Sequence, residues 1–179
     1  MATTAAPYGA RPVGTLSASG SFTSKTRNLP IITTYNTQIS NGDFVTLAAD
    51  GTITKNAGTT SLGCVGIFLG CSYTDPTTSQ KTFSNWWPAS NAATDAMAYV
   101  LDDPFVVFQM QSDASLETTD RGLNAAVVVT AGDTTFGKSR NALDGSTPDV
   151  TATLPLRIID FVDGPSSLPP KGTTASDAY

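Results

Sequence analysis

The sequence predicts an all-β protein whose strands close into a single β-barrel or sandwich. Thr is the commonest residue, at 28 of 179, and β-branched residues favour strands. Asp occurs 14 times but Glu only once, as Glu117, and Asp favours turns whereas Glu favours helices. The 15 Gly and 11 Pro residues separate short apolar runs, as expected of strands joined by tight turns. We therefore expect very little helix.

The chain length suits one domain with an extended segment at each end. Residues 1–21 are small and polar with few apolar anchors, which predicts either a disordered tail or, as we favour, an extended N-terminal arm that becomes ordered against a partner. Residues 22–162 contain the strand-like runs and predict the β-rich domain. Residues 163–179 are rich in Pro, Gly and Ser and predict an extended C-terminal tail.

Alternating and β-branched runs predict about eight to ten short strands. They lie at 22–27, 30–35, 44–48, 52–55, 62–73, 82–87, 96–101, 105–111, 125–130 and 150–161. Within the run 105–111, alternation places Val106, Phe108 and Met110 on one face, which we expect to face the core.

Turn and helix signals separate these runs. Asp50-Gly51 predicts a type I′ hairpin turn between two of the strands. Residues 113–124 are the best place for a short helix, with Asp113 as its N-cap and Gly122 at its end.

Charge and composition exclude several classes of function. The net charge is -5 and there is no His, which argues against a general nucleic-acid binder and removes the usual general base. No apolar run approaches the length of a membrane-spanning helix. We expect neither an enzyme nor a cofactor. Only 14% of residues are charged, which suggests that partners cover part of the surface.

The two cysteines, Cys64 and Cys71, are expected to be free and buried in one apolar strand. Along an extended strand they would lie too far apart to form a disulfide. Free thiols fit a reducing compartment, and residues 1–12 lack the apolar stretch of a signal peptide.

The carboxylates offer only weak candidates for a catalytic or metal site. Asp102 and Asp103 could form a glycosidase or metal pair, but adjacent strand residues face opposite ways and Pro104 follows them, so we interpret them as turn residues. The same turn interpretation applies to the acidic residues beside glycines, Asp43, Asp50, Asp133 and Asp144. The nearest approach to a basic cluster, Arg121, Lys138 and Arg140, is diluted by acidic neighbours and predicts a solvated face.

The adjacent tryptophans Trp86 and Trp87 indicate a contact surface. Consecutive residues of a strand face opposite ways, so at least one ring should be exposed or at an interface. A subunit interface is the favoured interpretation, and core packing and a sugar-stacking platform remain as alternatives.

Several segments together resemble a known family. They are ATTAAPYGARPVG at the start, NGDFVTLAADGTITK at 41–55, VGIFLGCSYTDP at 65–76, TFSNWWPAS at 82–90 and DRGLNAAVVVTAGDTTFGKS at 120–139. From about Ala5 to Phe161, the chain resembles the capsid decoration (cement) proteins of tailed bacteriophages, particularly short-tailed phages of marine bacteria and cyanobacteria. It is also similar to the wider group of β-barrel or β-tulip decoration modules.

The resemblance implies a virion protein, assembled in the host cytoplasm, that binds the outer surface of the head and clamps neighbouring major capsid subunits. It implies a homo-oligomer, with a trimer favoured over a dimer, and no contact with nucleic acid or membrane. Another phage structural part (a head fibre base, tail or minor capsid protein) is the main alternative, and a carbohydrate-binding β-module is a weaker one. The candidate contact residues are Pro7, Tyr8, Arg11, Pro12, Trp86 and Trp87.

Overall fold

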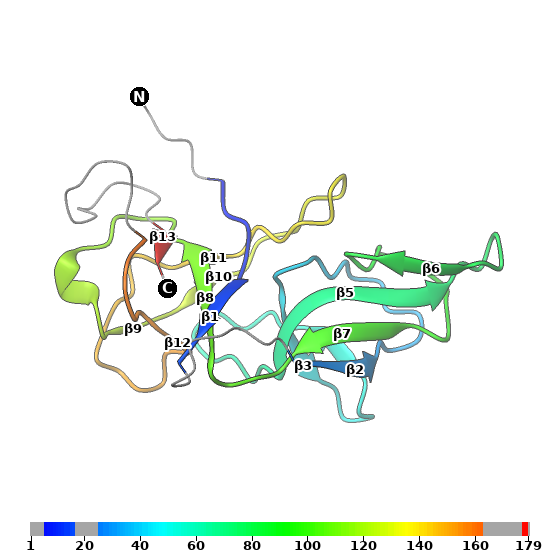
Figure 1. Cartoon of the computed structure of the whole chain (residues 1–179), viewed down its shortest axis with the longest axis horizontal. Helices are drawn as coiled ribbons and strands as arrows, with labels where there is room; N and C mark the ends of the chain where they lie inside the picture. The colour runs from blue at the N-terminus through cyan, green and yellow to red at the C-terminus, as the bar shows by residue number, and fades with distance from the viewer. Residues whose placement is uncertain (1–5, 17–24, 163–176, 179) are drawn as a thin grey trace.

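The computed structural model describes residues 6–16, 25–162 and 177–178 (Figure 1), and within them the fold is all-β, as predicted. One short 3₁₀ helix, η1 (Thr118–Asp120), accompanies the strands of this described part. The strands are β1 (Arg11–Thr15), β2 (Thr26–Pro30), β3 (Phe44–Leu47), β4 (Ile53–Lys55), β5 (Gly66–Thr74), β6 (Lys81–Ser84), β7 (Met97–Leu101), β8 (Val106–Gln111), β9 (Asn124–Ala125), β10 (Val127–Val128), β11 (Ala142–Leu143), β12 (Leu156–Arg157) and β13 (Asp177–Ala178).

The largest sheet has the strand order β2-β7-β5-β3-β4, and all its neighbouring strands are antiparallel. β6 also pairs with β5, at the end of β5 that runs from Cys71 to Thr74, whereas β3 pairs with its beginning. A single parallel bridge joins Ile31, just after β2, to Ile53 in β4. The two ends of the strand order therefore meet at one point, and the sheet curves around its core.

Alternation along β3 and β5 divides the core between the two faces of this sheet. Val45 and Phe68 point into one apolar cluster, whereas their neighbours Phe44 and Ile67 point into the other. The first cluster also contains Ile31, Ile39, Ile53, Cys71, Tyr73, Trp87, Ala93, Ala96, Ala98 and Val100. The second contains Ala10, Met110, Leu116, Ala125, Val127, Leu143, Ile158 and Phe161.

The second cluster is enclosed by short strands and long loops, at the left of Figure 1. β8 lies between β1 and β13, and the two-residue strands form the pairs β10-β11 and β9-β12. Val106 and Met110 are buried and Phe108 is half-buried against this cluster. The core face predicted for the run 105–111 is therefore confirmed.

The expectation that residues 1–21 need a partner to become ordered is wrong for their described part, residues 6–16. Residues 11–15 form β1, antiparallel to β8, and the segment before it lies on the domain. The backbone N–H of Gly9 donates to the carbonyl of Asn141, and that of Ala10 donates to Gly42. Backbone pairing with the domain supplies the contacts that the anchor-poor side chains of this segment lack. Residues 1–5 and 17–21 lie outside the described residues, as does most of the expected tail at 163–179.

Several predicted elements are shorter than expected. Of the strand expected at 30–35, only Pro30 lies in a strand, at the end of β2, and Ile31 forms a single bridge before the chain turns at Thr34, where φ is +62°. The helix expected over 113–124 is reduced to η1, capped by Glu117 and not by Asp113. The strand expected over 150–161 is reduced to β12, with a single bridge residue at Phe161.

Two local predictions need correction. Asp50-Gly51 does lie in the β3-β4 hairpin, but among its two residues only Gly51 has positive φ, so the turn is not type I′. Cys71 is buried and free as expected, whereas Cys64 is free but exposed, because it lies before β5 begins.

Candidate interaction surfaces

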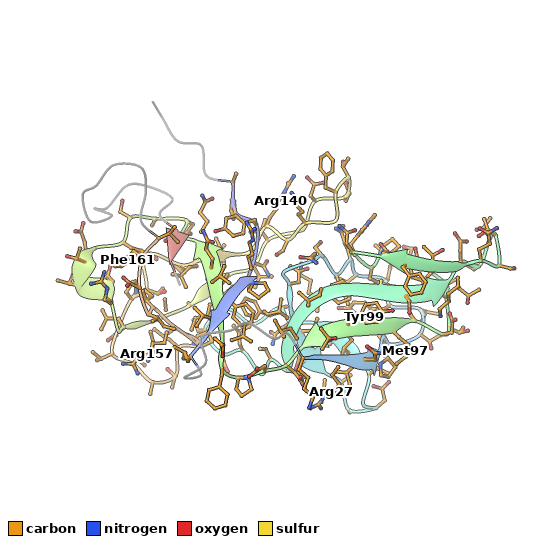
Figure 2. All side chains as sticks on the ribbon, in the orientation of Figure 1. Arg27, Met97, Tyr99, Arg140, Arg157 and Phe161 are labelled. Atoms are coloured by element: carbon orange, nitrogen blue, oxygen red, sulfur yellow. The ribbon has the colours of Figure 1, made fainter. Side chains whose placement is uncertain are left out.

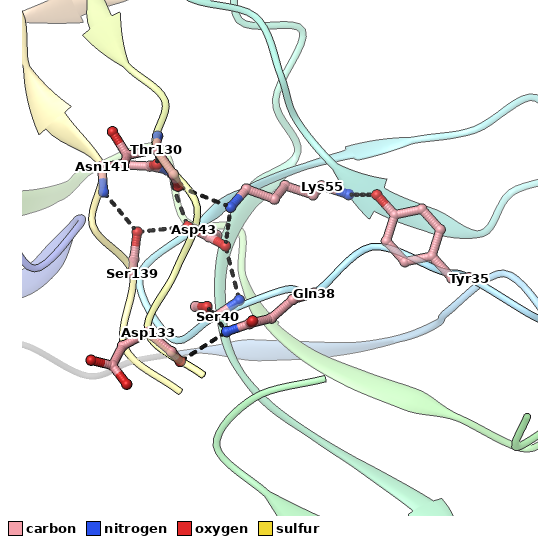
Figure 3. A network of polar contacts seen from close by, with 9 residues as sticks. All are labelled: Tyr35, Gln38, Ser40, Asp43, Lys55, Thr130, Asp133, Ser139 and Asn141. Carbon is pink, nitrogen blue, oxygen red and sulfur yellow. Dashed lines mark hydrogen bonds and ion pairs between the residues drawn. The ribbon is translucent and has the colours of Figure 1, made fainter. Parts of the chain in front are cut away.

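A fully buried carboxylate, Asp43, lies at the centre of a polar network that links the large sheet to residues 139–141 (Figure 3). One carboxylate oxygen accepts hydrogen bonds from the Ser139 hydroxyl at 2.6 Å and the Asn141 amide at 3.1 Å. The other accepts the Ser40 backbone N–H at 2.8 Å and pairs with the Lys55 amine at 2.9 Å. Every lone pair of the carboxylate is thus used, as a buried charge requires.

Lys55 brings the opposite charge into this network from β4. Its side chain is only 10% exposed, and its amine also donates to the Thr130 carbonyl at 3.4 Å. The backbone N–H of Lys55 donates to the Tyr35 hydroxyl at 2.8 Å. A buried ion pair gives little net stability, but loss of one partner leaves an uncompensated charge. Asp43 and Lys55 therefore depend on each other.

The network fixes the base of the β10-β11 loop, residues 129–141. Within this loop the Asp133 carboxylate accepts the backbone N–H groups of Phe136 and Thr135, and it pairs with Arg140 at 3.0 Å. These hydrogen bonds, led by that of Phe136, hold the pKa of Asp133 below its ordinary value. The Gln38 amide donates to the Asp133 carbonyl at 2.9 Å. The loop is thus held at its base and across its turn.

Phe136, at the turn of this loop, is one of three aromatic residues at least partly exposed on β6, on the segment after it and on this loop. We group the three, Phe83, Trp86 and Phe136, under the name aromatic surface. Phe83 is 73% exposed and Phe136 is 66% exposed, and Trp86 is half-buried. The Asn85 amide donates to the Phe136 carbonyl at 3.2 Å. Gly137 has φ of +66°, and a side chain there would overlap the indole of Trp86. The loop and the segment after β6 are therefore in close contact.

Trp87, in contrast, is a core residue, so its inclusion among the predicted contact residues was wrong. Its side chain has no exposed area. The ring meets Tyr73 edge to face, with the centroids 5.4 Å apart, and its N–H donates to the Tyr35 carbonyl at 3.1 Å. The opposite orientation of consecutive side chains, which sequence reasoning used, leaves only Trp86 at the surface.

A second exposed apolar surface surrounds β1, and we define this β1 surface as Arg11, Pro12, Val13, Leu16 and Phe105. Leu16 is 61% exposed, Phe105 is 60% exposed and Val13 is 41% exposed. The backbone N–H of Leu16 donates to the Phe105 carbonyl at 2.8 Å, which places these two residues next to each other. The pairing of β1 with β8 shifts register between Pro12 and Gly14, so Val13 lies at a bulge.

The predicted contact residues fall into two groups that flank the β10-β11 loop. Arg11 is exposed and Pro12 is half-buried on the β1 surface, and Pro7 and Tyr8 are half-buried just before it. Next to Tyr8, Gly9 lies so close to Ser139 that a side chain would meet its Cβ at 2.5 Å. Trp86 contacts the same loop at Gly137, two residues before Ser139 in the sequence. Figure 1 shows β1 and β6 in different halves of the molecule.

Most of the acidic residues near turns have the structural roles expected of them. Asp50 and Asp144 accept backbone N–H groups two residues ahead. Asp103 accepts the backbone N–H of Phe105 in the same way. Asp102 pairs with Arg27, which is labelled in Figure 2, at 2.7 Å. Asp43 is the exception. Its Gly-Asp sequence is like that of a surface turn, but its carboxylate is fully buried. No local signal distinguishes it: the Ser40 N–H is a turn partner three residues away, and the partners that bury it, Lys55, Ser139 and Asn141, lie 12, 96 and 98 residues away.

Two hollows lie beside these features. A half-open, mainly apolar cavity of about 450 Å³ is lined by residues that include Ile67, Leu101, Val106 and Ile158. A second, of about 470 Å³, lies beside Lys55 and is lined by Tyr35, Gln38 and Val129 among others. The first adjoins the β1 surface, because Val106 belongs to the strand that pairs with β1.

Residues 6–16, 25–162 and 177–178 contain no cluster of three His, Cys, Asp or Glu side chains that could hold a metal ion. Within the same part of the chain, no helix is long and apolar enough to span a membrane. Comparisons with models of protein families, with curated proteins and with solved structures find no match to this chain.

Proposed function

We propose that this chain is a structural protein of a phage virion, which binds the outer surface of the head and cements neighbouring major capsid subunits. The observation that carries this proposal is the presence of exposed apolar surfaces in both halves of the chain, the β1 surface and the aromatic surface. A protein that joins other chains needs more than one contact surface. The sequence resemblance to phage decoration proteins supports the same function.

The β1 surface supports contact with the shell. An exposed Phe and an Arg fit the composition of an interface centre, in which aromatic residues and Arg are enriched, and the exposed Leu and Val add apolar area. β1 is also an edge strand, because among the described strands it pairs with β8 alone. A capsid chain could therefore add backbone hydrogen bonds to apolar contacts. Many such modest contacts, repeated over a lattice, give firm attachment through effective concentration.

The test uses heads of the encoding phage that were assembled without this chain, to which the purified full chain is added. We expect the double variant Leu16→Ser with Phe105→Ser to bind with at least about tenfold lower affinity than the unchanged chain, because buried apolar anchors dominate interfaces. The matched control is Leu47→Ser with Val150→Ser, which removes side chains that are 49% and 81% exposed but lie outside both surfaces. Bound copies per head are counted by quantitative gel densitometry.

Equal loss of binding by both double variants would contradict the β1 surface as the contact. Failure of the unchanged chain to bind heads would contradict the function itself. Binding to isolated glycans that is lost on Trp86→Ala would contradict it in favour of a carbohydrate-binding module. Binding confined to a vertex would indicate a minor virion component.

A further inference from the structure

The strand β6 leaves one edge without a partner strand. Among the described strands β6 pairs only with β5, and it lies at the outer edge of the large sheet in Figure 1. Its most exposed large side chain, Phe83, belongs to the aromatic surface. Unprotected edges are templates for pairing with another chain.

The backbone groups that face this free edge can be identified. The carbonyl of Gln80 accepts the N–H of Asp75, which makes these two residues a hydrogen-bonded pair of the β5-β6 hairpin. In an antiparallel ladder such pairs alternate with pairs that are not hydrogen-bonded. Because Thr74 opposes Lys81 and Ser72 opposes Phe83, the N–H and C=O groups of Lys81 and Phe83 point away from β5.

A lysine on an edge strand ordinarily opposes pairing, but the charge of Lys81 is already compensated. Its amine pairs with Asp95 at 2.9 Å. Hydrogen bonds from the backbone N–H and the hydroxyl of Thr74, followed by that of Lys81, hold the pKa of Asp95 below its ordinary value, so the carboxylate stays ionised at neutral pH. The edge of β2 differs from that of β6: β2 carries Arg27 and Pro30, and a proline cannot donate to a ladder.

We propose that β6 pairs antiparallel with the β6 of a second copy of this chain, across a two-fold axis at Thr82. A two-fold axis normal to the sheet joins the two copies so that the same face of β6 points the same way in both. Residues that oppose each other across the axis must therefore lie on the same face of β6, as Lys81 and Phe83 do. An axis at Lys81 would oppose two like charges. An axis at Phe83 would need residue 85, which lies beyond the end of β6 at Ser84. Only the axis at Thr82 sets Lys81 of each copy against Phe83 of the other.

The same register brings the segment after β6 close to the other copy. Beyond the strand, residues 84 and 85 of one copy face residues 80 and 79 of the other. The turn at 75–80 of each copy therefore approaches Asn85 of the other copy, whose amide is bonded to the Phe136 carbonyl. Dimerisation thus places the exposed Phe83 ring beside Lys81 of the other copy and leaves the β1 surface free.

The experiment uses the full chain alone, so its outcome is independent of head binding. Sedimentation velocity from low micromolar to near-millimolar concentration should show a monomer–dimer equilibrium. Phe83→Pro removes one outward N–H and the ring, and proline is tolerated where a strand edge is free. We expect this variant to raise the dimer dissociation constant at least about tenfold, with an unchanged circular dichroism spectrum.

A cysteine cross-link tests the register. In a Cys64→Ser background, Thr82→Cys places two thiols at the axis, where opposed Cα atoms lie about 4.5 Å apart, within disulfide range. Mild oxidation should give a covalent dimer, whereas Thr26→Cys on the β2 edge should not. A chain that remains monomeric at all concentrations, or that cross-links equally through both edges, would overturn the proposal.

Discussion

The two halves of this molecule are stabilised in different ways. The half around the large sheet consists of paired strands of three to nine residues with an apolar interior. The other half consists largely of loops and two-residue strands, and the buried Asp43–Lys55 network joins it to the sheet. The difference shows how a loop-rich half can be positioned by a few fully satisfied polar contacts where long strand ladders are missing.

This contrast predicts that loss of the network has the largest effect. Asp43→Asn leaves the Lys55 amine buried without its counter-charge and turns an amide N–H toward existing donors. We expect a loss of roughly 3–5 kcal/mol in the free energy of unfolding, measured by urea denaturation.

Asp50→Asn is the matched control, because Asp50 also adjoins a glycine but is exposed at a turn. Its side chain accepts the Thr52 N–H and hydroxyl, and Asn can accept the same hydrogen bonds. We expect a change within about 0.5 kcal/mol. Similar losses from both substitutions would show that the network does not carry the difference between the halves.

A smaller loss in the free energy of unfolding is expected from a substitution at Gly9, where the N-terminal segment lies against Ser139 of the network. Gly9 has φ of +78°, and an added Cβ would meet Ser139 at 2.5 Å and the Gly42 carbonyl at 2.7 Å. Gly51 has φ of +81° with open space around it. Gly9→Ala should therefore cost more than Gly51→Ala, which carries only the conformational penalty of roughly 1–3 kcal/mol. Equal losses of unfolding free energy would show that the segment is not closely packed there.

The smallest expected effect is a difference in reactivity between the two thiols, Cys64 and Cys71. Burial raises the pKa of Cys71 to about 12, whereas Cys64 is exposed, although partial desolvation raises its pKa as well. A thiol reagent at mildly alkaline pH should label Cys64 in the folded chain and Cys71 only after unfolding. Rapid labelling of Cys71 in Cys64→Ser would mean that the large sheet opens readily.

The sequence predicted the sheet half well, because alternation is a local signal that long strands display. The pairing of the strands on either side of Asp50-Gly51 was foreseen from that turn signal. Alternation also gave the core face of Val106 and Met110, because β8 is a six-residue strand within the other half. The loop-rich half was poorly predicted, because two-residue strands are too short for alternation to be recognised. The burial of Asp43 and the docking of residues 6–16 depend on contacts across more than ninety residues, which no local pattern records.

The most direct test of the central claim is a cryo-electron microscopy map of particles of the encoding phage. We predict this chain on the outside of the shell in numbers comparable with the major capsid protein, with the β1 surface against the shell. Particles that lack the chain, or that hold it only in the tail or at one vertex, would contradict the account.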